Sequence, residues 1–330
     1  MAGGASGGGP RLSVGVVVVT HRAREHLASC LPPLFASPLR PRVLVVNSSS
    51  GDGTVEEARR LGAEVLVVPR REFNHGLTRE LARQELGTDV VAMLTPDAYP
   101  TDEGFLERLT APVRAGDAAI AYGRQVAREG ADLVERFGRE FSYPAASDTR
   151  TLGDWARHGS YTHFCSNTCA AWSNAELDAI GGFRVTLVSE ETIAAAELLR
   201  RGRAIAYVAD AVVVHWHRHG LADEFARHFD IGYTRERFRP LLRWRQGDEA
   251  RGALFAKALL ARAWREEPAS LPRVTEHLAA KWLGYRAGLL GPSLSLAVAR
   301  RLSGQDYFWD TPAARGAAPA SQPALGAAGG

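Results

Sequence analysis

Short apolar runs recur along the first third of the chain, and stretches with helical spacing separate them. These runs are apolar almost throughout and lack the alternation of a strand with one exposed face. Continuous apolar strands separated by helices are typical of a parallel sheet that is covered on both faces. We therefore predict a doubly wound α/β fold with a mostly parallel sheet and helices on both faces. The predicted strands are residues 12–20, 43–46, 64–68 and 90–94.

The second half of the chain becomes mainly helical. The spacing of its apolar residues predicts a helix over 190–201, a strand over 204–217 and further helices from about 225 to 301. Residues 124–160 have weak periodicity and receive no assignment. We expect a C-terminal helical region to follow the sheet.

Two segments have the pattern of a helical capping box, in which Ser or Thr precedes Glu by three positions. Thr54-x-x-Glu57 predicts the start of a helix that runs to residue 61, and Ser173-x-x-Glu176 predicts another helix start.

The two ends of the chain are built from Gly, Ala, Ser and Pro. Residues 1–11 and 311–330 contain too few large apolar side chains to offset the entropy lost on ordering, so we expect disordered tails. Between them we expect a sheet domain over 12–232 and the helical region over 233–310.

Composition excludes several classes of protein. Of the 330 residues, 45% are hydrophobic and 23% are charged, which is typical of a globular protein with a real core. The net charge of +3 arises from 40 basic and 37 acidic residues, so nucleic acid is not an expected partner.

Cysteine content and hydropathy indicate a cytoplasmic protein. Cys30, Cys165 and Cys169 are too few for a disulfide framework, and buried structural thiols are favoured over zinc ligation. The N-terminus lacks the pattern of a secretory signal. The early apolar run over 14–19 is far shorter than the about 20 residues needed to span a bilayer.

Polar residues that follow the predicted strands are the first candidates for chemistry, because ligands of doubly wound folds bind beyond the carboxyl ends of the strands. No glycine-rich phosphate fingerprint follows any strand, which excludes typical dinucleotide enzymes and P-loop NTPases. Thr20, the loop 47–53 and Asp97 do follow strands. A carboxylate such as Asp97 suits a divalent cation that carries a diphosphate, and a helix cap or a solvated loop end is the alternative.

Two later motifs carry further candidates. Glu190-Glu191 begins a helix, where the helix dipole alone would favour acidic residues. His215 and His217 alternate on a predicted strand, so both imidazoles can face one site. Such a pair is a common shape for metal ligation, although histidines also serve as ordinary interior hydrogen bonders.

Taken in order, several motifs resemble the inverting family-2 glycosyltransferases of the GT-A (Rossmann-like) fold, and most closely their rhamnosyltransferase-like branch. The resemblance spans about residues 12–310. The segments that carry it are the opening strand into Thr20, Val45-Val46-Asn47-Ser48-Ser49-Ser50-Gly51-Asp52-Gly53-Thr54, Phe73-Asn74-His75-Gly76-x-Thr78-Arg79, Thr95-Pro96-Asp97-Ala98, Ser166-Asn167, Gly181-Gly182-Phe183, Ser189-Glu190-Glu191, Asp210-Ala211-Val212-x-x-His215-x-His217 and Phe229-Asp230-Ile231-Gly232.

The resemblance implies roles for individual residues. Asp97 falls where the family holds its metal ion, Mg²⁺ or Mn²⁺, and His215 falls where a late histidine adds a ligand. Glu191 falls where the family places its general base. The nucleotide-sugar-binding residues that the resemblance implies are Thr20, Asn47, Ser48, Asn74, Gly76, Arg79 and Thr95.

This sequence departs from the family's pattern at three of these places. Asn47 stands where an aspartate is common, which alters its contact with the base of the nucleotide. Thr95 replaces the first aspartate of the metal motif, so the ion would depend more on substrate phosphates. The usual Glu-Asp pair is Glu190-Glu191, which makes the base one methylene longer.

The resemblance implies a metal-dependent, inverting transfer of a sugar, L-rhamnose from dTDP-rhamnose, in cell-surface polysaccharide synthesis. The acceptor would be a hydroxyl of a glycan or of a lipid-linked saccharide. The arginines between 235 and 245, with Phe238 and Trp244, suit an anionic membrane surface, which would place the protein at the inner face of the cell membrane. A solvated helical face and a homo-oligomer interface are the alternatives for that stretch.

Two other functions remain as alternatives. His215, His217 and His219 could form a zinc hydrolase with Asp97 as a further ligand, although Arg218 stands where such enzymes commonly place a carboxylate. The chain could also be a non-catalytic module that binds a nucleotide sugar.

Overall fold

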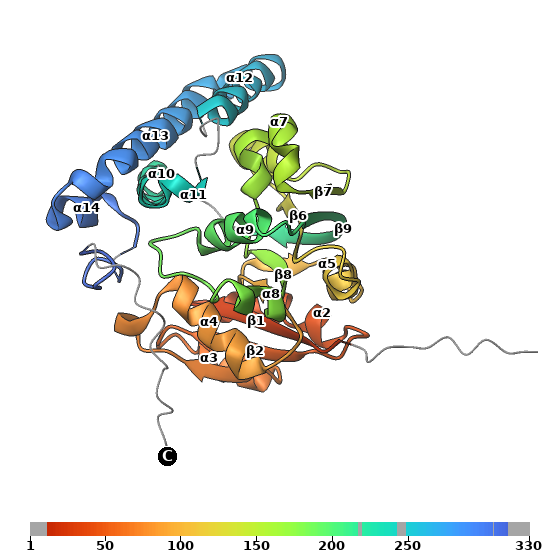
Figure 1. Ribbon diagram of the computed structural model, residues 1–330. Helices are drawn as coiled ribbons and strands as arrows, with labels where there is room; N and C mark the ends of the chain where they lie inside the picture. The colour runs from red at the N-terminus through yellow and green to blue at the C-terminus, as the bar shows by residue number, and fades with distance from the viewer. Residues whose placement is uncertain (1–11, 217–219, 243–248, 306, 316–330) are drawn as a thin grey trace, which may run out of the picture.

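A computed structural model describes residues 12–216, 220–242, 249–305 and 307–315. The described residues form one nine-stranded sheet with the order β3-β2-β1-β4-β8-β6-β9-β5, and β7 pairs with β9 (Figure 1). The strands are β1 (Val14–Thr20), β2 (Arg42–Asn47), β3 (Glu64–Val67), β4 (Val90–Leu94), β5 (Ala98–Pro100), β6 (Ile120–Ala127), β7 (Asp148–Arg150), β8 (Cys169–Ser173) and β9 (Ile205–His215).

The predicted mostly parallel sheet and the predicted C-terminal helical region are both present, so the predicted fold class is confirmed. β1, β2, β3 and β4 are parallel to one another. β8 enters the sheet antiparallel to both β4 and β6, whereas β9 runs parallel to β6. The short strands β5 and β7 pair antiparallel with β9 and extend the sheet beyond it.

Helices cover both faces of the sheet, as the continuous apolar strands predicted (Figure 1). Val17 and Val19 of β1 belong to one hydrophobic core, and Val16 and Val18 belong to the other, because successive side chains of a strand point to opposite faces. The helices are α1 (Arg24–Cys30), α2 (Pro32–Phe35), α3 (Thr54–Arg60), α4 (His75–Leu86), α5 (Phe105–Arg114), α6 (Leu133–Ser142), α7 (Trp155–His158), α8 (Asn174–Ala179), α9 (Glu190–Arg200), α10 (Leu221–Arg237), α11 (Arg239–Leu242), α12 (Glu249–Glu266), α13 (Leu271–Leu290) and α14 (Leu296–Leu302).

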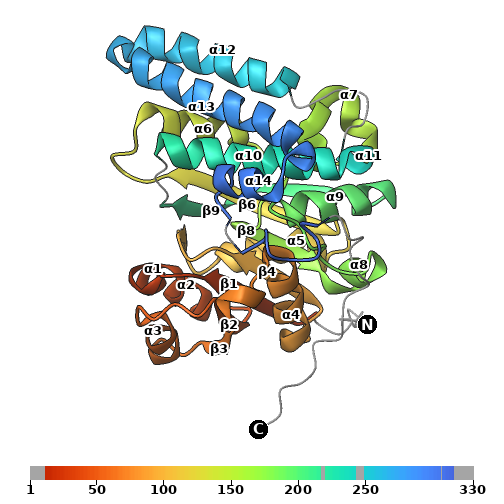
Figure 2. The same ribbon diagram turned by 90° about the vertical axis from the view of Figure 1, so that its left-hand side faces the viewer.

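The C-terminal helices form a layer of their own over α10 (Figure 2). α10 and α13 approach closely because both carry glycine at their contact. A Cβ added to Gly232 would collide with the backbone of Tyr285, and one added to Gly288 would collide with the backbone of Phe229. Residue 232, after which we expect the helical region to begin, lies within α10.

Ordered packing also extends beyond the predicted start of the C-terminal tail at residue 311. Tyr307, Phe308 and Trp309 are buried, and Trp309 meets Tyr233 edge to face. Ala314 is buried as well. Residues 316–330 and 1–11, which we expected to be disordered, lie outside the described residues. Within the described part of the chain, no helix is both long and apolar enough to cross a membrane.

One predicted helix cap is present and the other is wrong. Ser173 Oγ accepts the backbone N–H of Glu176, as predicted for α8. At α3 the N-cap is Gly53, and Thr54 is already helical. The Thr54 hydroxyl donates to Asp52 and accepts from the backbone of Ala23, which ties α3 to the loop after β1. All three cysteines are buried free thiols, as expected.

Candidate active site

The two predicted metal ligands are neighbours in the fold. The chain leaves β4, turns and returns as β5, whose Ala98 lies opposite His215 at the end of β9. This register places His215 Nε2 at 3.2 Å from Asp97 Oδ2, and the side chains are 12% and 15% exposed. The backbone N–H of Trp216 also donates to the Asp97 carbonyl at 2.8 Å. Two residues from distant parts of the sequence therefore form one small polar site.

The imidazole of His215 is oriented from behind by Gln125 of β6. Gln125 Oε1 lies 2.8 Å from His215 Nδ1 and accepts from Arg139 Nη1 at 2.9 Å. A guanidinium can only donate, which fixes the carboxamide oxygen on this side and makes His215 Nδ1 a donor. Nε2 then faces Asp97 with a lone pair or a second proton. A polar partner behind a histidine is the usual arrangement around a metal-binding imidazole.

The residues at this site fit a divalent ion that is shared with a substrate. Asp97 and His215 offer one oxygen and one nitrogen that face each other, so a cation between them would satisfy both. Thr95 Oγ1 is buried and has no hydrogen-bond partner among the described residues. Within that same part of the chain, no group of three His, Cys, Asp or Glu side chains could hold a metal. Further ligands would have to come from phosphate oxygens or water.

A second polar group lies at the start of α9. Ser189 precedes it with φ of 65°, a conformation uncommon for a non-glycine residue. Glu190 is buried and accepts from Arg79 Nη1 at 2.6 Å and from Asn167 Nδ2 at 3.0 Å. Asn167 Oδ1 is itself held by Trp172 Nε1 at 2.9 Å. Arg79, which we predicted in the nucleotide pocket, therefore forms a buried ion pair with Glu190.

The two glutamates differ in environment. Burial opposes the ionisation of Glu190, but the Arg79 guanidinium and the Asn167 amide outweigh it and lower the pKa of the Glu190 carboxyl. Glu191 is only partly exposed, and its pKa is raised by burial and by the neighbouring Glu190 carboxylate. Neighbouring carboxyls with separated pKa values are a frequent feature of acid–base sites.

The loop before β8 connects these two groups. Ser166 Oγ accepts from Gln125 Nε2 at 3.1 Å, and Gln125 also holds His215. The next residue, Asn167, holds Glu190. Cys165, on the other side of Ser166, lies with its Sγ 3.5 Å from the Glu191 carbonyl. Three consecutive residues thus join the Asp97 side of the site to the Glu191 side.

Asn74 and Gly76 anchor the segment that leads into α9. Asn74 caps α4, and its Nδ2 donates to the carbonyl of Thr186 at 2.8 Å. Gly76 lies against the backbone of Arg184, where an added Cβ would overlap the carbonyl oxygen. Both residues therefore fix the segment just before Glu190.

Thr20, Asn47 and Ser48 lie together at the carboxyl ends of β1 and β2, but all three are buried. Asn47 Nδ2 donates to Thr20 Oγ1 at 3.2 Å and to Ser50 Oγ at 2.8 Å, while its Oδ1 accepts the backbone N–H of Ser50. Ser48 Oγ lies 2.9 Å from His21 Nδ1. In this structure the three side chains shape the loop after β2 through contacts with their neighbours.

Comparison with known proteins identifies the family. Residues 15–177 match the family described as Glycosyl transferase family 2. The O-antigen chain rhamnosyltransferase WbaN of Salmonella anatum is 30% identical over 275 residues, which cover 82% of this chain and 86% of WbaN. The chain belongs to glycosyltransferase family 2. The O-antigen chain rhamnosyltransferase RfbN of Salmonella typhimurium is 29% identical over 307 residues, which cover 91% of this chain and 96% of RfbN.

Solved structures agree on the fold of this family 2 glycosyltransferase. The mannosyltransferase PcManGT from Pyrobaculum calidifontis, in complex with GDP-Man and Mn²⁺, has a TM-score of 0.56 at 18% identity over 85% of this chain and 86% of that one. Residues 1–349 of TarS from S. aureus, in complex with UDP-GlcNAc, have a TM-score of 0.51 at 15% identity over 90% of each chain. The enzyme therefore has the GT-A fold.

Family membership favours glycosyl transfer over the two alternatives raised by the sequence. The zinc-hydrolase hypothesis rested on His217 and His219 beside His215, and those two residues lie outside the described part of the chain. The non-catalytic hypothesis gives way to an enzyme of glycosyl transfer, which is what both curated relatives are named for.

Sequence reasoning missed several residues of this glycosyltransferase site. Gln125 and Arg139 lie in the section whose weak periodicity gave no assignment. Only the contact of Gln125 with His215, and that of Arg139 with Gln125, reveal them. Asn167 belonged to a matching motif but had no assigned role. Its hydrogen bond to Glu190 supplies one.

Proposed function

We propose that this family 2 glycosyltransferase moves L-rhamnose from dTDP-rhamnose, with inversion, to a hydroxyl of a glycan or lipid-linked saccharide in cell-surface polysaccharide synthesis. The observation that carries the proposal is the joining of two polar groups, Asp97 with His215 and Glu190 with Glu191, by the loop 165–168. Rhamnose as the donor sugar is supported by the two curated rhamnosyltransferases.

Asp97 and His215 would hold Mg²⁺ or Mn²⁺ together with the diphosphate of the donor. A divalent ion bound there would neutralise the charge that develops on the departing nucleoside diphosphate. The nitrogen ligand favours Mn²⁺, because Mg²⁺ prefers an all-oxygen set. Gln125 keeps the His215 ring oriented, and Arg139 keeps Gln125 oriented.

Glu191 would take the proton of the acceptor hydroxyl as that oxygen attacks the anomeric carbon of the sugar. A single displacement inverts the configuration at that carbon. Glu190 is a positioning residue, because its carboxylate is already engaged by Arg79 and Asn167. Its negative charge also raises the pKa of Glu191, which makes Glu191 a stronger base once it is ionised.

The raised pKa of Glu191 gives a testable pH dependence. Glu191 acts as a base only when it is ionised, so transfer should rise with pH through a pKa that lies above the ordinary glutamate value of 4.5. In Glu190→Gln the neighbouring negative charge is gone, and the acidic limb of kcat/KM should move to lower pH. An acidic limb at the ordinary carboxyl value, unchanged in Glu190→Gln, would contradict this role of the pair.

Donor binding tests the proposal most simply. Thermal unfolding should be followed with dTDP, UDP, GDP and dTDP-rhamnose, each with Mn²⁺, Mg²⁺ or EDTA. A ligand at 100 times its Kd adds about 2.7 kcal/mol of stability. We expect the largest shift with dTDP compounds and Mn²⁺. No shift with any nucleotide would contradict the proposed function, and a larger shift with another nucleotide would contradict the dTDP donor.

Asp97→Asn should remove the metal-dependent part of that stabilisation. The substitution keeps the size of the side chain but removes the charge that would attract the ion. Asp117→Asn is the matched control, because Asp117 is exposed on a turn after α5. Equal metal-dependent shifts in Asp97→Asn, Asp117→Asn and the unmodified enzyme would exclude Asp97 as a metal ligand.

We also propose that the enzyme works at the inner face of the cell membrane, through the helices α12 and α13. The basic stretch of the sequence is only partly available for this contact. Phe238 packs against the cluster formed by Leu242 and α9, and Arg243, Trp244 and Arg245 lie outside the described residues. α12 and α13 instead carry exposed apolar side chains, namely Leu254, Leu260, Trp264, Trp282, Leu283 and Leu290.

Co-sedimentation with vesicles tests the membrane contact. Tryptophan rings and basic side chains favour anionic interfaces, so more protein should sediment with phosphatidylglycerol vesicles than with phosphatidylcholine vesicles. Trp264→Ser should reduce this binding without reducing nucleotide binding. Sedimentation that is independent of anionic lipid and of Trp264 would remove the proposal.

A further inference from the structure

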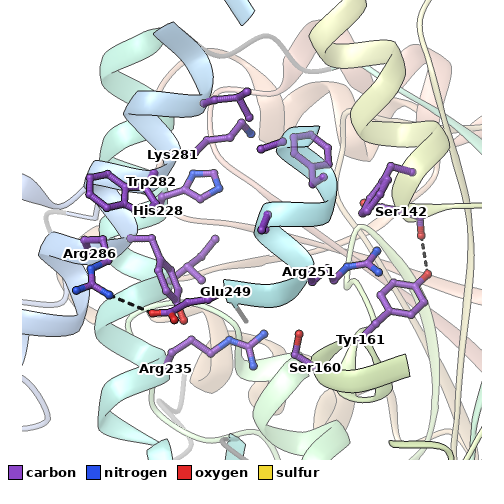
Figure 3. Close-up of a pocket in the computed structure, with 18 of the residues that line it drawn as sticks. Ser142, Ser160, Tyr161, His228, Arg235, Glu249, Arg251, Lys281, Trp282 and Arg286 are labelled. Carbon is purple, nitrogen blue, oxygen red and sulfur yellow. Dashed lines mark hydrogen bonds and ion pairs between the residues drawn. The ribbon is translucent and has the colours of Figure 1, made fainter. Parts of the chain in front are cut away.

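A cavity of about 670 Å³ lies outside the groups described above, between α6, α10, α12, α13 and the turn Gly159–His163 (Figure 3). Its size is typical of sites for small organic ligands. Its walls are mainly aromatic and aliphatic, and the aromatic members are Phe141, Tyr161, Phe164, Phe255, Trp282 and Tyr285.

Basic side chains outnumber carboxylates among the residues that line this cavity. Four of its residues are basic, and two of them are paired: Arg286 with Glu249 at 3.0 Å near the surface, and Lys281 with Glu224 at 3.0 Å. Arg251 lies deeper, with its guanidinium carbon 4.0 Å from the ring centre of Tyr161 and 4.7 Å from that of Phe141. None of the described carboxylates pairs with Arg251. The four basic residues are Arg235, Arg251, Lys281 and Arg286.

Burial lowers the pKa of Arg251, because an isolated cation is disfavoured in an apolar setting. The tyrosine and phenylalanine faces compensate only in part for the water that the guanidinium has lost. An anion beside Arg251 would complete its interactions. Apolar walls, together with a guanidinium that no described carboxylate pairs with, therefore fit a ligand that has both an apolar chain and an acidic head.

Side chains link the cavity to the two groups of the proposed reaction centre. A smaller cavity of about 240 Å³ shares Phe164, His228 and Lys281 with it and is also lined by Arg139. Arg139 donates to Gln125, which holds His215. Phe164 also directly precedes Cys165, whose thiol contacts the backbone of Glu191. The large cavity is thus linked to the Glu191 side through Phe164 and Cys165, and to the His215 side through the smaller cavity, Arg139 and Gln125.

We propose that this cavity binds the lipid part of the acceptor, an apolar chain that ends in a phosphate or diphosphate, with the acidic group beside Arg251. The inference rests on the proposed function, because it identifies the acceptor as lipid-linked. Trp282 lines the cavity and is 63% exposed, and the adjacent Leu283 is exposed as well. A chain longer than the cavity could therefore continue onto an apolar surface.

Direct binding of simple amphiphiles tests the proposal without the natural acceptor. Dodecyl phosphate, dodecyl maltoside and inorganic phosphate, each below any micelle-forming concentration, should be titrated into the full chain by calorimetry. We expect dodecyl phosphate to bind at least about tenfold more tightly than either of the other two probes, because only it satisfies both the apolar walls and Arg251. Equal binding of dodecyl phosphate and dodecyl maltoside would overturn the role of the positive charge.

Two variants locate the binding in the cavity. Gly252 lines it, and a Cβ there would meet no atom within 4 Å, so Gly252→Phe should fold and fill the space. Arg251→Gln removes the charge. Gly252→Phe and Arg251→Gln should each lower the affinity for dodecyl phosphate at least tenfold. Ala261→Phe, at an exposed position of α12, should leave that affinity unchanged. Unchanged affinity in Gly252→Phe would overturn the proposal.

Two further measurements separate acceptor binding from the binding of bulk phospholipid, and this proposal from the proposed function. Dihexanoyl phosphatidylglycerol binding as tightly as dodecyl phosphate would assign the cavity to bulk phospholipid and overturn the acceptor assignment. Nucleotide binding, followed by thermal unfolding, should be the same in Gly252→Phe and the unmodified enzyme. If Gly252→Phe loses dodecyl phosphate binding and keeps nucleotide binding, the result supports the proposal. If the unmodified enzyme binds no nucleotide, the result contradicts the proposed function but not the assignment of the cavity.

Discussion

Replacing Glu191 with Gln should lower the rate of sugar transfer by about 10²–10⁴-fold, which corresponds to about 3–5 kcal/mol of activation free energy. Gln keeps the size of the side chain but cannot accept the proton of the acceptor hydroxyl. The rate should be measured with donor and acceptor both saturating. Donor binding, followed by thermal unfolding, should stay unchanged, because Glu191 is not among the residues proposed to hold the metal ion or the nucleotide.

Glu191→Asp is the informative control for this loss. It restores the Glu-Asp pair of the family's pattern and keeps an ionisable carboxyl. We expect it to retain far more activity than Glu191→Gln, with a reduction that reflects only the shorter reach. Near-native turnover in Glu191→Gln would exclude Glu191 as the general base.

Replacing Arg79 with Leu should destabilise the protein by about 3–5 kcal/mol, because it leaves the Glu190 carboxylate buried without its cation. The two side chains are only 5% and 4% exposed, and their nitrogen and oxygen lie 2.6 Å apart. The free energy of unfolding should be measured by urea denaturation. The double variant Arg79→Leu with Glu190→Leu should recover part of the loss, because it removes the orphaned charge as well.

An exposed ion pair provides the comparison. Arg42 and Glu64 also form a close pair, at 2.7 Å, but each side chain is about half exposed. Arg42→Leu should therefore change the free energy of unfolding much less than Arg79→Leu does. A similar small loss in both variants would mean that water reaches Glu190 and that the buried network does not hold it.

Much of the fold could be predicted because its strands are buried on both faces. The run in β1 is apolar at successive positions, and only a sheet covered on both sides explains that pattern. The direction of β8 could not be predicted. Its five residues carry no signal for direction, and the antiparallel insertion between β4 and β6 depends on the path of the chain through the preceding section.

The candidate site was predictable where residue order carried the information. The expected proximity of Asp97 and His215 is confirmed by their contact, while their role as metal ligands stays a prediction. Two partners that orient His215 and Glu190 were not predictable, because they lie 90 or more residues away along the chain. Gln125 reaches His215 across 90 residues, and Arg79 reaches Glu190 across 111.

The expected nucleotide contacts of Thr20 and Asn47 show another limit of the sequence. Residue order placed both at the ends of neighbouring strands, where the structure has them. The order of residues along the chain could not reveal that the side-chain amide of Asn47 donates to Thr20 and Ser50 and accepts from the backbone of Ser50. The hydrogen-bond partners of Asn47 depend on the conformation of the loop after β2, which forms only when the chain folds.

Transfer of radiolabelled rhamnose from dTDP-rhamnose to a lipid-linked saccharide tests the central claim most directly. With Mn²⁺ and a membrane extract that supplies the acceptor, the unmodified enzyme should move label into the organic phase, and EDTA, Asp97→Asn and Glu191→Gln should each prevent this. Label that stays in the aqueous phase while the enzyme demonstrably binds both donor and acceptor would contradict the account, as would full transfer by either variant.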